Sequence, residues 1–162
     1  MATKKTEVIE IRPIEIKKVT VRVVGDTPLI MHAWSEKAKR MMLEAQMGIA
    51  KGKKKEVKNP ADDFIRSMYW LTPMPEDGTM ESFEEAIANG ARFGFPVTAF
   101  KQAAISAAYR MGWAKDKMSM RGAFYIDSDE NGMIEIHSDT PEMREDMVKV
   151  GMGTADIRYR GE

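Results

Sequence analysis

The chain has 162 residues, of which 43% are apolar and 31% are charged, and it contains no cysteine. This length suits one domain, and the composition is that of a globular rather than a disordered protein. The absence of cysteine excludes disulfides, thiolate zinc sites and cysteine nucleophiles. No apolar run approaches the roughly 18 residues of a membrane span, and residues 1–10 lack the apolar core of a signal peptide. We therefore expect a soluble, cytoplasmic protein that binds no membrane.

The net charge is zero, but the two signs are segregated along the chain. Residues 1–60 carry 14 Lys/Arg and 7 Asp/Glu, whereas residues 61–162 carry 11 and 18. Such asymmetry is typical of a basic surface that binds a polyanion. It also fits attraction between the two halves of the chain, or between neighbouring subunits.

The N-terminal part is expected to contain a flexible tail at residues 1–6, followed by a single domain over residues 7–162. Between Val8 and Val24, β-branched residues alternate with polar ones, which predicts one or two strands, the stronger over residues 16–24. A turn over residues 25–28 then leads into a short apolar segment.

Two helices and a basic loop are predicted next. Ser35 is a typical N-cap for a helix that runs to about Met47, and Asn59 followed by Pro60 begins a second helix. The loop between them, residues 49–59, contains most of the lysines of this region.

The middle of the chain alternates between helical and extended patterns. Ser82 begins a capping box for a short helix, residues 93–96 form a brief extended element, and Thr98 is expected to cap a longer alanine-rich helix. Gly112 is expected to end this helix, and a loop follows over residues 115–121.

The last quarter is dominated by predicted strands. A hairpin is expected between residues 123–127 and 133–137, a single helical turn at residues 140–142, and two further strands at residues 147–150 and 155–160. The order of elements is not the regular alternation of a doubly wound fold. We predict an α+β two-layer sandwich, in which helices cover one face of a mostly antiparallel sheet, with a ferredoxin-like or RRM-like arrangement as its specific form.

Conventional catalytic and metal-binding motifs are missing from the sequence. The two histidines, His32 and His137, are far apart, and no nucleophile elbow, phosphate loop or dinucleotide fingerprint occurs. Residues 127–132 match the first half of a calcium loop, but Ser138 stands where the bidentate carboxylate is required, so a hairpin turn is favoured. We expect no cofactor, no metal and no enzymatic activity. A hydrolase remains an alternative if either histidine meets carboxylates in a pocket.

Basic and aromatic residues supply the candidate binding site. Flexible lysines neutralise phosphates without reading bases, and aromatic rings on a strand stack with unpaired bases. The proposed nucleic-acid-binding residues are Lys51, Lys53, Lys54, Lys55, Lys58, Lys101, Arg121, Phe124, Tyr125, Arg158 and Arg160. The alternative for the lysine-rich stretch is an ordinary solvated loop.

Fifteen methionines are an unusual number for this length. Five of them have helical core spacing, which favours packing in the interior, whereas an adaptable surface for a partner is the alternative. These five are Met41, Met42, Met47, Met68 and Met111.

Most of residues 19–160 resembles a family of uncharacterised phage and prophage proteins. The segments that carry the resemblance are residues 24–38, 94–101, 121–125 and 142–160, with motifs such as Gly25-Asp26-Thr27-Pro28-Leu29 and Gly153-Thr154-Ala155-Asp156. The resemblance implies a phage protein in the host cytoplasm but transfers no catalytic residues. Members of that family continue past the position of Glu162, so we expect a truncated member or a fragment.

The sequence thus predicts a phage-type protein that binds single-stranded DNA or RNA, or a ribonucleoprotein, without sequence specificity. The alternative is a protein-interaction module, which inhibits a host or defence protein or acts as an oligomeric assembly factor. In that case the partners are a host protein or further copies of the chain.

Overall fold

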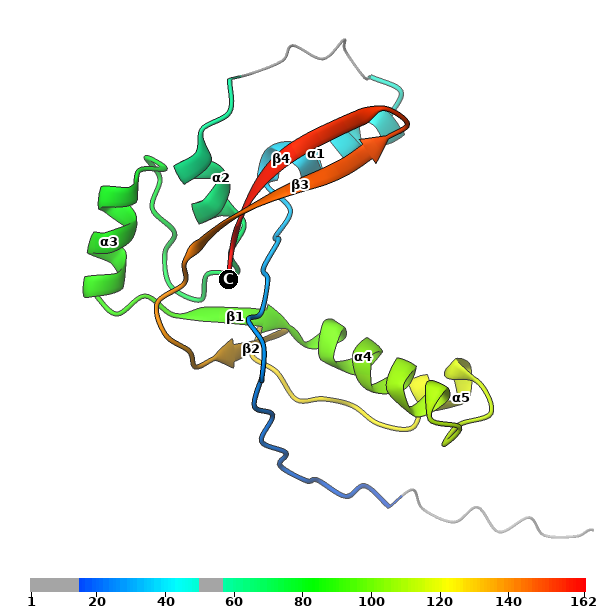
Figure 1. Ribbon diagram of the computed structural model, residues 1–162. Coiled ribbons are helices and arrows are strands. Elements are labelled where there is room, and N and C mark those ends of the chain that lie inside the picture. Colours follow the sequence, from blue (N-terminus) through cyan, green and yellow to red (C-terminus); the bar gives the residue numbers. More distant parts are fainter. Residues whose placement is uncertain (1–14, 50–56) are drawn as a thin grey trace, which may run out of the picture.

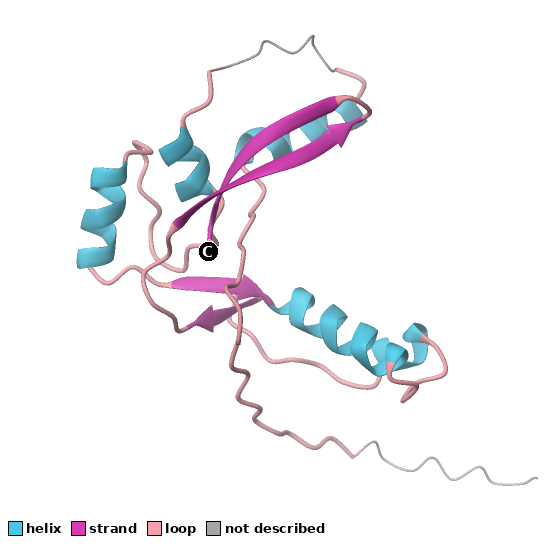
Figure 2. Ribbon diagram, viewed as in Figure 1, coloured by secondary structure: helices cyan, strands magenta, loops and turns pink. Residues whose placement is uncertain are grey.

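The structure is a computed structural model that describes residues 15–49 and 57–162. Within these ranges it contains five helices and two small antiparallel sheets of two strands each (Figures 1 and 2). In chain order the elements are α1 (Glu36–Gln46), α2 (Pro60–Arg66), α3 (Met80–Ala88), β1 (Phe93–Pro96), α4 (Val97–Arg110), α5 (Lys117–Arg121), β2 (Met133–Ile136), β3 (Met143–Gly151) and β4 (Thr154–Gly161). The α+β class is confirmed. The expected single sheet with its ferredoxin-like or RRM-like order does not form in the described ranges.

The first sheet corrects the predicted hairpin. Residues 123–127 form no strand, and β2 pairs instead with β1, so that Phe93 lies opposite Ile136 and Phe95 opposite Ile134. These apolar cross-strand pairs bring together segments about 40 residues apart, and they stabilise β2 on β1 more than a strand over residues 123–127 would. The turn itself forms as expected, because the Asp129 carboxylate accepts the Met133 N–H at 2.7 Å.

The second sheet is the hairpin of β3 and β4, and both strands are longer than predicted. Met143 pairs with Gly161 at one end and Gly151 with Thr154 at the other, with an irregularity between Lys149 and Gly151. Gly153 has a φ of 76°, a conformation that side chains rarely adopt, and it therefore closes the turn. The helical turn expected at residues 140–142 does not form.

The first two helices begin where the sequence predicts. The Ser35 hydroxyl accepts the Ala38 N–H at 3.2 Å at the start of α1. The Asn59 side chain accepts hydrogen bonds from the N–H groups of Ala61 and Asp62 at the start of α2. Pro60 occupies the first helical position, where it has no N–H group that would need an acceptor. Both helices are therefore fixed by local sequence.

Three other helix starts differ from the prediction. Thr79, not Ser82, caps α3, because its hydroxyl accepts the Ser82 N–H at 3.3 Å. Helix α4 follows Pro96 directly and has no side-chain cap, so Thr98 does not have the expected role. The loop expected at residues 115–121 contains α5, which the Asp116 side chain caps.

The core lies where α2, α3, β1 and the end of β4 meet. Its six buried side chains are Met31, Phe64, Ile65, Met68, Phe83 and Phe93. The rings meet edge to face, with centroids 5.0 Å apart for Phe64 and Phe83 and 4.7 Å apart for Trp70 and Phe93. Edge-to-face contact is the geometry that ring quadrupoles favour. This aromatic cluster therefore holds α2, α3 and β1 together.

The predicted strand over residues 16–24 is wrong. The segment is extended but pairs with no strand, and Ile16, Val19 and Val21 are 89%, 81% and 74% exposed. Strand propensity becomes a strand only where a neighbouring edge accepts the backbone hydrogen bonds. In this structure no described strand is paired with it.

Of the five methionines predicted to pack in the interior, only Met68 does so, and it lies just beyond the end of α2 at Arg66. Met68 is 3% exposed and belongs to the core, whereas the other four, Met41, Met42, Met47 and Met111, are exposed. Helix α1 has no buried residue at all, so its apolar stripe faces solvent in this structure. None of the helices in residues 15–49 and 57–162 has the length and apolarity of a membrane span.

Candidate nucleic-acid interface

The predicted binding residues do not meet on one surface. Lys51, Lys53, Lys54 and Lys55 lie outside the described residues. Lys58, Arg158 and Arg160 belong to the region of β3 and β4, whereas Lys101, Arg121, Phe124 and Tyr125 lie on or beside α4 and α5 (Figure 1). The single basic and aromatic surface expected from the sequence is thus divided in two.

Lys58 is neutralised by the second sheet. Its ammonium group lies 2.6 Å from the Asp156 carboxylate and also donates to the Ile157 carbonyl. The hydrogen bond from Lys58 to Asp156 is the main reason why the pKa of Asp156 is held below its ordinary value. A cation bound in this way is a poor phosphate ligand, because a phosphate would have to displace the carboxylate.

The two predicted arginines of β4 are likewise paired with acids. Arg160 lies directly opposite Arg144, an unfavourable arrangement of like charges, and Asp146 lies 2.9 Å from Arg144 and 3.3 Å from Arg160. Arg158 lies 3.7 Å from Asp156. Asp156 is therefore shared by Lys58 and Arg158, and Asp146 by Arg144 and Arg160, so each predicted cation of this hairpin already has a carboxylate partner.

His32 extends this charged cluster. Its Nε2 atom lies 3.5 Å from the Arg158 guanidinium. Burial, followed by the positive charges of Arg160 and Arg158, lowers the pKa of His32 from its ordinary value. The ring is therefore kept neutral beside the arginines, and no carboxylate is hydrogen-bonded to it among the described residues. This is not the arrangement of a general base with an orienting acid.

The second group forms a coherent basic and aromatic site. The Lys101 ammonium group lies 4.8 Å from the ring centre of Tyr125 and 5.8 Å from that of Phe124. Tyr125 is 88% exposed, whereas Phe124 is half-buried. The sequence predicted that only one ring of this pair would face solvent. The structure agrees, although the two residues lie in an extended return segment beside α4 and not in a central strand.

Residues 97–125 as a whole, which we call the basic arm, share this character. The arm contains five Lys/Arg and a single acid, Asp116, so its net charge is +4. None of its cations forms an ion pair with a carboxylate of the described chain. They are Lys101, Arg110, Lys115, Lys117 and Arg121. Figure 1 shows α4 extending from β1 toward α5, away from the core and the second sheet.

Sequence reasoning missed half of the arm. Arg110, Lys115 and Lys117 were not selected, and neither were the exposed rings of Tyr109 and Trp113. The Lys117 ammonium group lies 5.6 Å from the Tyr109 ring centre, a second cation beside a ring. The signal in the sequence is the local net charge, because residues 97–125 carry five Lys/Arg and one acid. The count over residues 61–162 as a whole is acidic and therefore hides this basic stretch.

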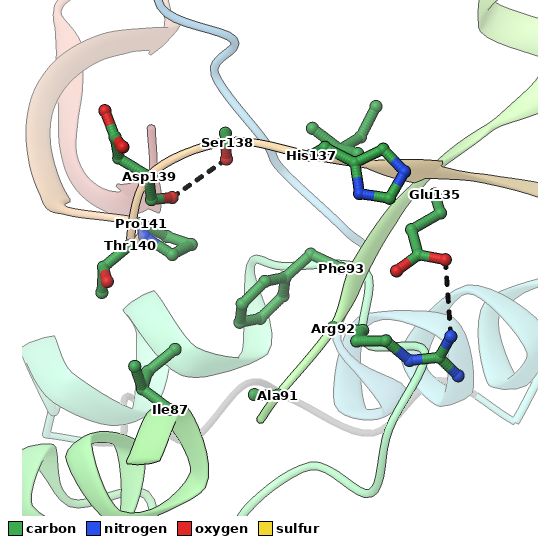
Figure 3. Close-up of a pocket in the computed structure, with 11 residues that line it drawn as sticks. Ile87, Ala91, Arg92, Phe93, Glu135, His137, Ser138, Asp139, Thr140 and Pro141 are labelled. Atoms are coloured by element: carbon green, nitrogen blue, oxygen red, sulfur yellow. Dashed lines mark hydrogen bonds and ion pairs between the residues drawn. The ribbon is translucent and has the colours of Figure 1, made fainter. Parts of the chain in front are cut away.

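The pocket beside His137 does not provide a catalytic arrangement (Figure 3). Phe93, Glu135, His137 and Asp139 line it together with residues of α3 and the loop before β3. Glu135 is paired with Arg92 at 3.4 Å, and the Ser138 hydroxyl donates to the Asp139 carbonyl. Within the described part of the chain, no nucleophile is hydrogen-bonded to His137.

The calcium-like loop acts as a turn. Asp129 caps the backbone N–H groups of Asn131 and Met133, and Asp127 is paired with Lys18. The described residues contain no group of three or more His, Asp or Glu side chains with metal-site geometry.

Comparison of the chain with known protein families finds no matching family model. Comparisons with curated proteins and with solved structures find no match either.

Proposed function

We propose that this protein binds single-stranded DNA or RNA through the basic arm. The observation that carries the proposal is the set of five cations that form no ion pair with a described carboxylate, interleaved with solvent-exposed rings on residues 97–125. Cations that are not already paired bind phosphates with release of counterions, and exposed rings stack with unpaired bases. The phage-like resemblance of the sequence fits this function in the cytoplasm of a bacterial host.

The proposed mode of binding is insensitive to base sequence. Three of the five cations are lysines, which contact phosphates as point charges. Tyr125 and Trp113 provide the stacking surfaces, and every base has a face that stacks on a ring. The cations of β4 are assigned no role in binding, because Asp146 and Asp156 already neutralise them.

The test is a salt titration of oligonucleotide binding. Fluorescence anisotropy with labelled oligo-dT and oligo-U measures the slope of log K against log salt concentration for each polymer. Replacing all five arm cations by Gln is expected to reduce the magnitude of this slope by up to about 3.5, because each phosphate contact contributes about 0.7 for single strands. The matched control is Lys39→Gln with Arg40→Gln on α1, where both cations are paired with glutamates, and its slope is expected to be unchanged.

A single substitution tests the stacking contribution. Tyr125→Ala is expected to weaken binding by about 5- to 150-fold at constant salt, since one stacked base contributes about 1–3 kcal/mol. Absence of binding to both polymers at low salt, or equal slopes for the arm variant and the α1 control, would refute the proposed function.

A second candidate function is supported by the exposed apolar surface. Met143, Met147 and Ile157 are exposed on one face of the second sheet, and the apolar stripe of α1 is exposed as well. Exposed apolar surface of this extent marks protein contact sites. We therefore retain a protein-interaction module, either an assembly factor that acts as an oligomer or an inhibitor of a host protein. Light scattering and a pull-down at high salt test it, and a monomer without a protein partner would contradict it.

A further inference from the structure

Residues 16–24, which we call the donor segment, have the sequence of a strand but no strand partner. β-Branched residues alternate with polar ones, yet no backbone hydrogen bond joins this segment to another described residue. Its five large apolar side chains, Ile16, Val19, Val21, Val23 and Val24, are 73–89% exposed. Leaving so much β-branched surface in water forgoes the stabilisation that burial would provide.

The second sheet has one open edge. Glu142 and Glu162 exchange both backbone hydrogen bonds at 3.0 Å, so the even-numbered residues of β3 bond to β4. The N–H and C=O groups of Met143, Glu145 and Met147 consequently point away from β4. No described backbone group bonds to them.

The other edge of this sheet is already occupied. On the outer side of β4, the Met31 N–H donates to the Gly161 carbonyl and the Gly161 N–H donates to the Ser67 hydroxyl, each at 2.8 Å. The Lys58 ammonium group donates to the Ile157 carbonyl on the same side. Of the two edges of this sheet, the β3 edge is therefore the one that the described residues leave open to an incoming strand.

The exposed area of the chain indicates that a partner is needed. The chain has an accessible surface of 14151 Å² and a mass of 18.3 kDa. A compact monomer of that mass exposes about 8,100 Å². The 21 residues outside the described ranges have a mass of about 2.4 kDa and contribute at most about 3,500 Å², taking about 1.45 Å² per dalton for an extended chain. The remaining excess is of the size that a subunit interface covers.

We propose that the donor segment of one copy adds as an antiparallel strand to the β3 edge of a second copy, and that the second copy does the same in return. This arrangement is a two-fold symmetric dimer, the commonest form of protein assembly. It goes beyond nucleic-acid binding and rests instead on the second candidate function, for which it names the partner and the contact.

The lengths and apolar side chains of the two segments match. The strand β3 and the donor segment both span nine residues. With Val21 opposite Met147, the valines at 19, 21 and 23 join the exposed apolar face of Met147 and Ile157. The donor segment carries three cations and no acid, whereas β3 carries two cations and two acids, so apolar burial and main-chain bonds, not charge, set the register.

The partner is a second copy because the donor segment does not lie on the β3 edge of its own chain. Lys18 is paired with Asp127, in the turn region that precedes β2, and not near β3. Addition of a strand to an exposed edge is a common mode of recognition, in which main-chain bonds give affinity and alternate side chains give register.

Cysteine crosslinking tests the register directly, because the native chain has no cysteine. Val21→Cys and Met147→Cys are made as separate proteins, mixed and oxidised. In the proposed pairing their Cα atoms lie about 5.5 Å apart, which suits a disulfide. A covalent heterodimer is expected from this mixture, and much less from Thr20→Cys mixed with Met147→Cys, since residue 20 faces the opposite side of the sheet.

A pair of proline variants tests the hydrogen bonds. Light scattering is expected to give twice 18.3 kDa for the native chain. Val21→Pro removes an N–H that points to β3 and is expected to weaken dimerisation at least tenfold, whereas the N–H lost in Thr20→Pro points outward and is tolerated. Neither change affects a hydrogen bond of the monomer, and circular dichroism of both variants checks this.

The outcomes distinguish strand addition at β3 from self-association through another surface. A native monomer at every concentration overturns strand addition together with self-association. A stable dimer that both prolines weaken equally, or the absence of a crosslink between the Val21→Cys and Met147→Cys proteins, overturns strand addition alone and leaves self-association through another surface. Oligonucleotide binding through the basic arm is measured independently of all these results.

Discussion

Gly161 is a position at which a single added methyl group should disturb the buried core. Its N–H donates to the Ser67 hydroxyl, and its carbonyl accepts the Met31 N–H. A Cβ atom at this position would lie 2.7 Å from Met68 Cγ and 3.1 Å from Met68 Sδ. Met68 is almost fully buried, so it has little room to move away. Three segments distant in sequence therefore meet at one glycine.

Gly161→Ala is expected to destabilise the protein by about 1–3 kcal/mol, the usual cost of an overpacked core. Urea unfolding, followed by the fluorescence of Trp70 in the adjoining core, measures the change. Gly151→Ala is the matched control in the same hairpin, because an added Cβ there meets nothing within 4 Å. Its effect is expected to be within about 0.5 kcal/mol.

A double substitution isolates the contact. Met68→Ala alone removes buried volume and should cost about 2–5 kcal/mol. In the double variant of Met68→Ala and Gly161→Ala, the clash disappears. Its destabilisation is therefore expected to be smaller than the sum of the two single destabilisations by more than about 0.5 kcal/mol. Equal stability of the Gly161→Ala and Gly151→Ala variants, or full additivity in the double variant, would refute the close packing at this junction.

Three further predictions concern local interactions. Lowering the pH from about 7.5 to about 5.5 should destabilise the native protein more than it destabilises the His32→Asn variant. The fold lowers the pKa of His32, so its contribution to stability is complete above the ordinary pKa of histidine and is lost as the pH falls through the pKa of the folded state. Urea midpoints of both proteins at the two pH values measure this, and parallel pH profiles would contradict it. Trp70→Phe should cost about 0.5–1.5 kcal/mol by thermal or urea unfolding, since the hydrogen bond from the indole N–H to the Ile65 carbonyl at 2.8 Å is lost while that carbonyl still accepts the Met68 N–H; an unchanged midpoint would contradict this prediction. Asn59→Ala should cost about 0.5–2 kcal/mol in the same assay because α2 loses its cap, and Asn59→Asp should retain most of the stability.

Some local features of this protein could be predicted from its sequence, although the caps of α3, α4 and α5 were not among them. Ser35 and Asn59 mark the starts of α1 and α2, and Gly153 marks the turn between β3 and β4. Each of these signals depends on hydrogen bonds or backbone angles within a few residues. Such interactions are present whatever the rest of the chain does.

Pairing between distant segments could not be predicted in this way. The strand β2 matched a local hairpin equally well in sequence, but it pairs with β1 through Phe93 and Phe95. The donor segment has the strongest strand pattern in the chain and forms no strand. Strand propensity describes a side chain that suits a half-buried sheet and does not identify the neighbouring strand.

The candidate site depended on the tertiary structure for the same reason. The sequence by itself determined which residues are basic or aromatic, and its candidates include Lys101 and Tyr125, which the fold brings within 4.8 Å of each other. Only the folded chain decided that the arginines of β4 are paired with Asp146 and Asp156, while the cations of the basic arm form no such pairs with described carboxylates. Charge is a property of each residue, but its availability to a ligand depends on which opposite charges the fold brings within about 4 Å.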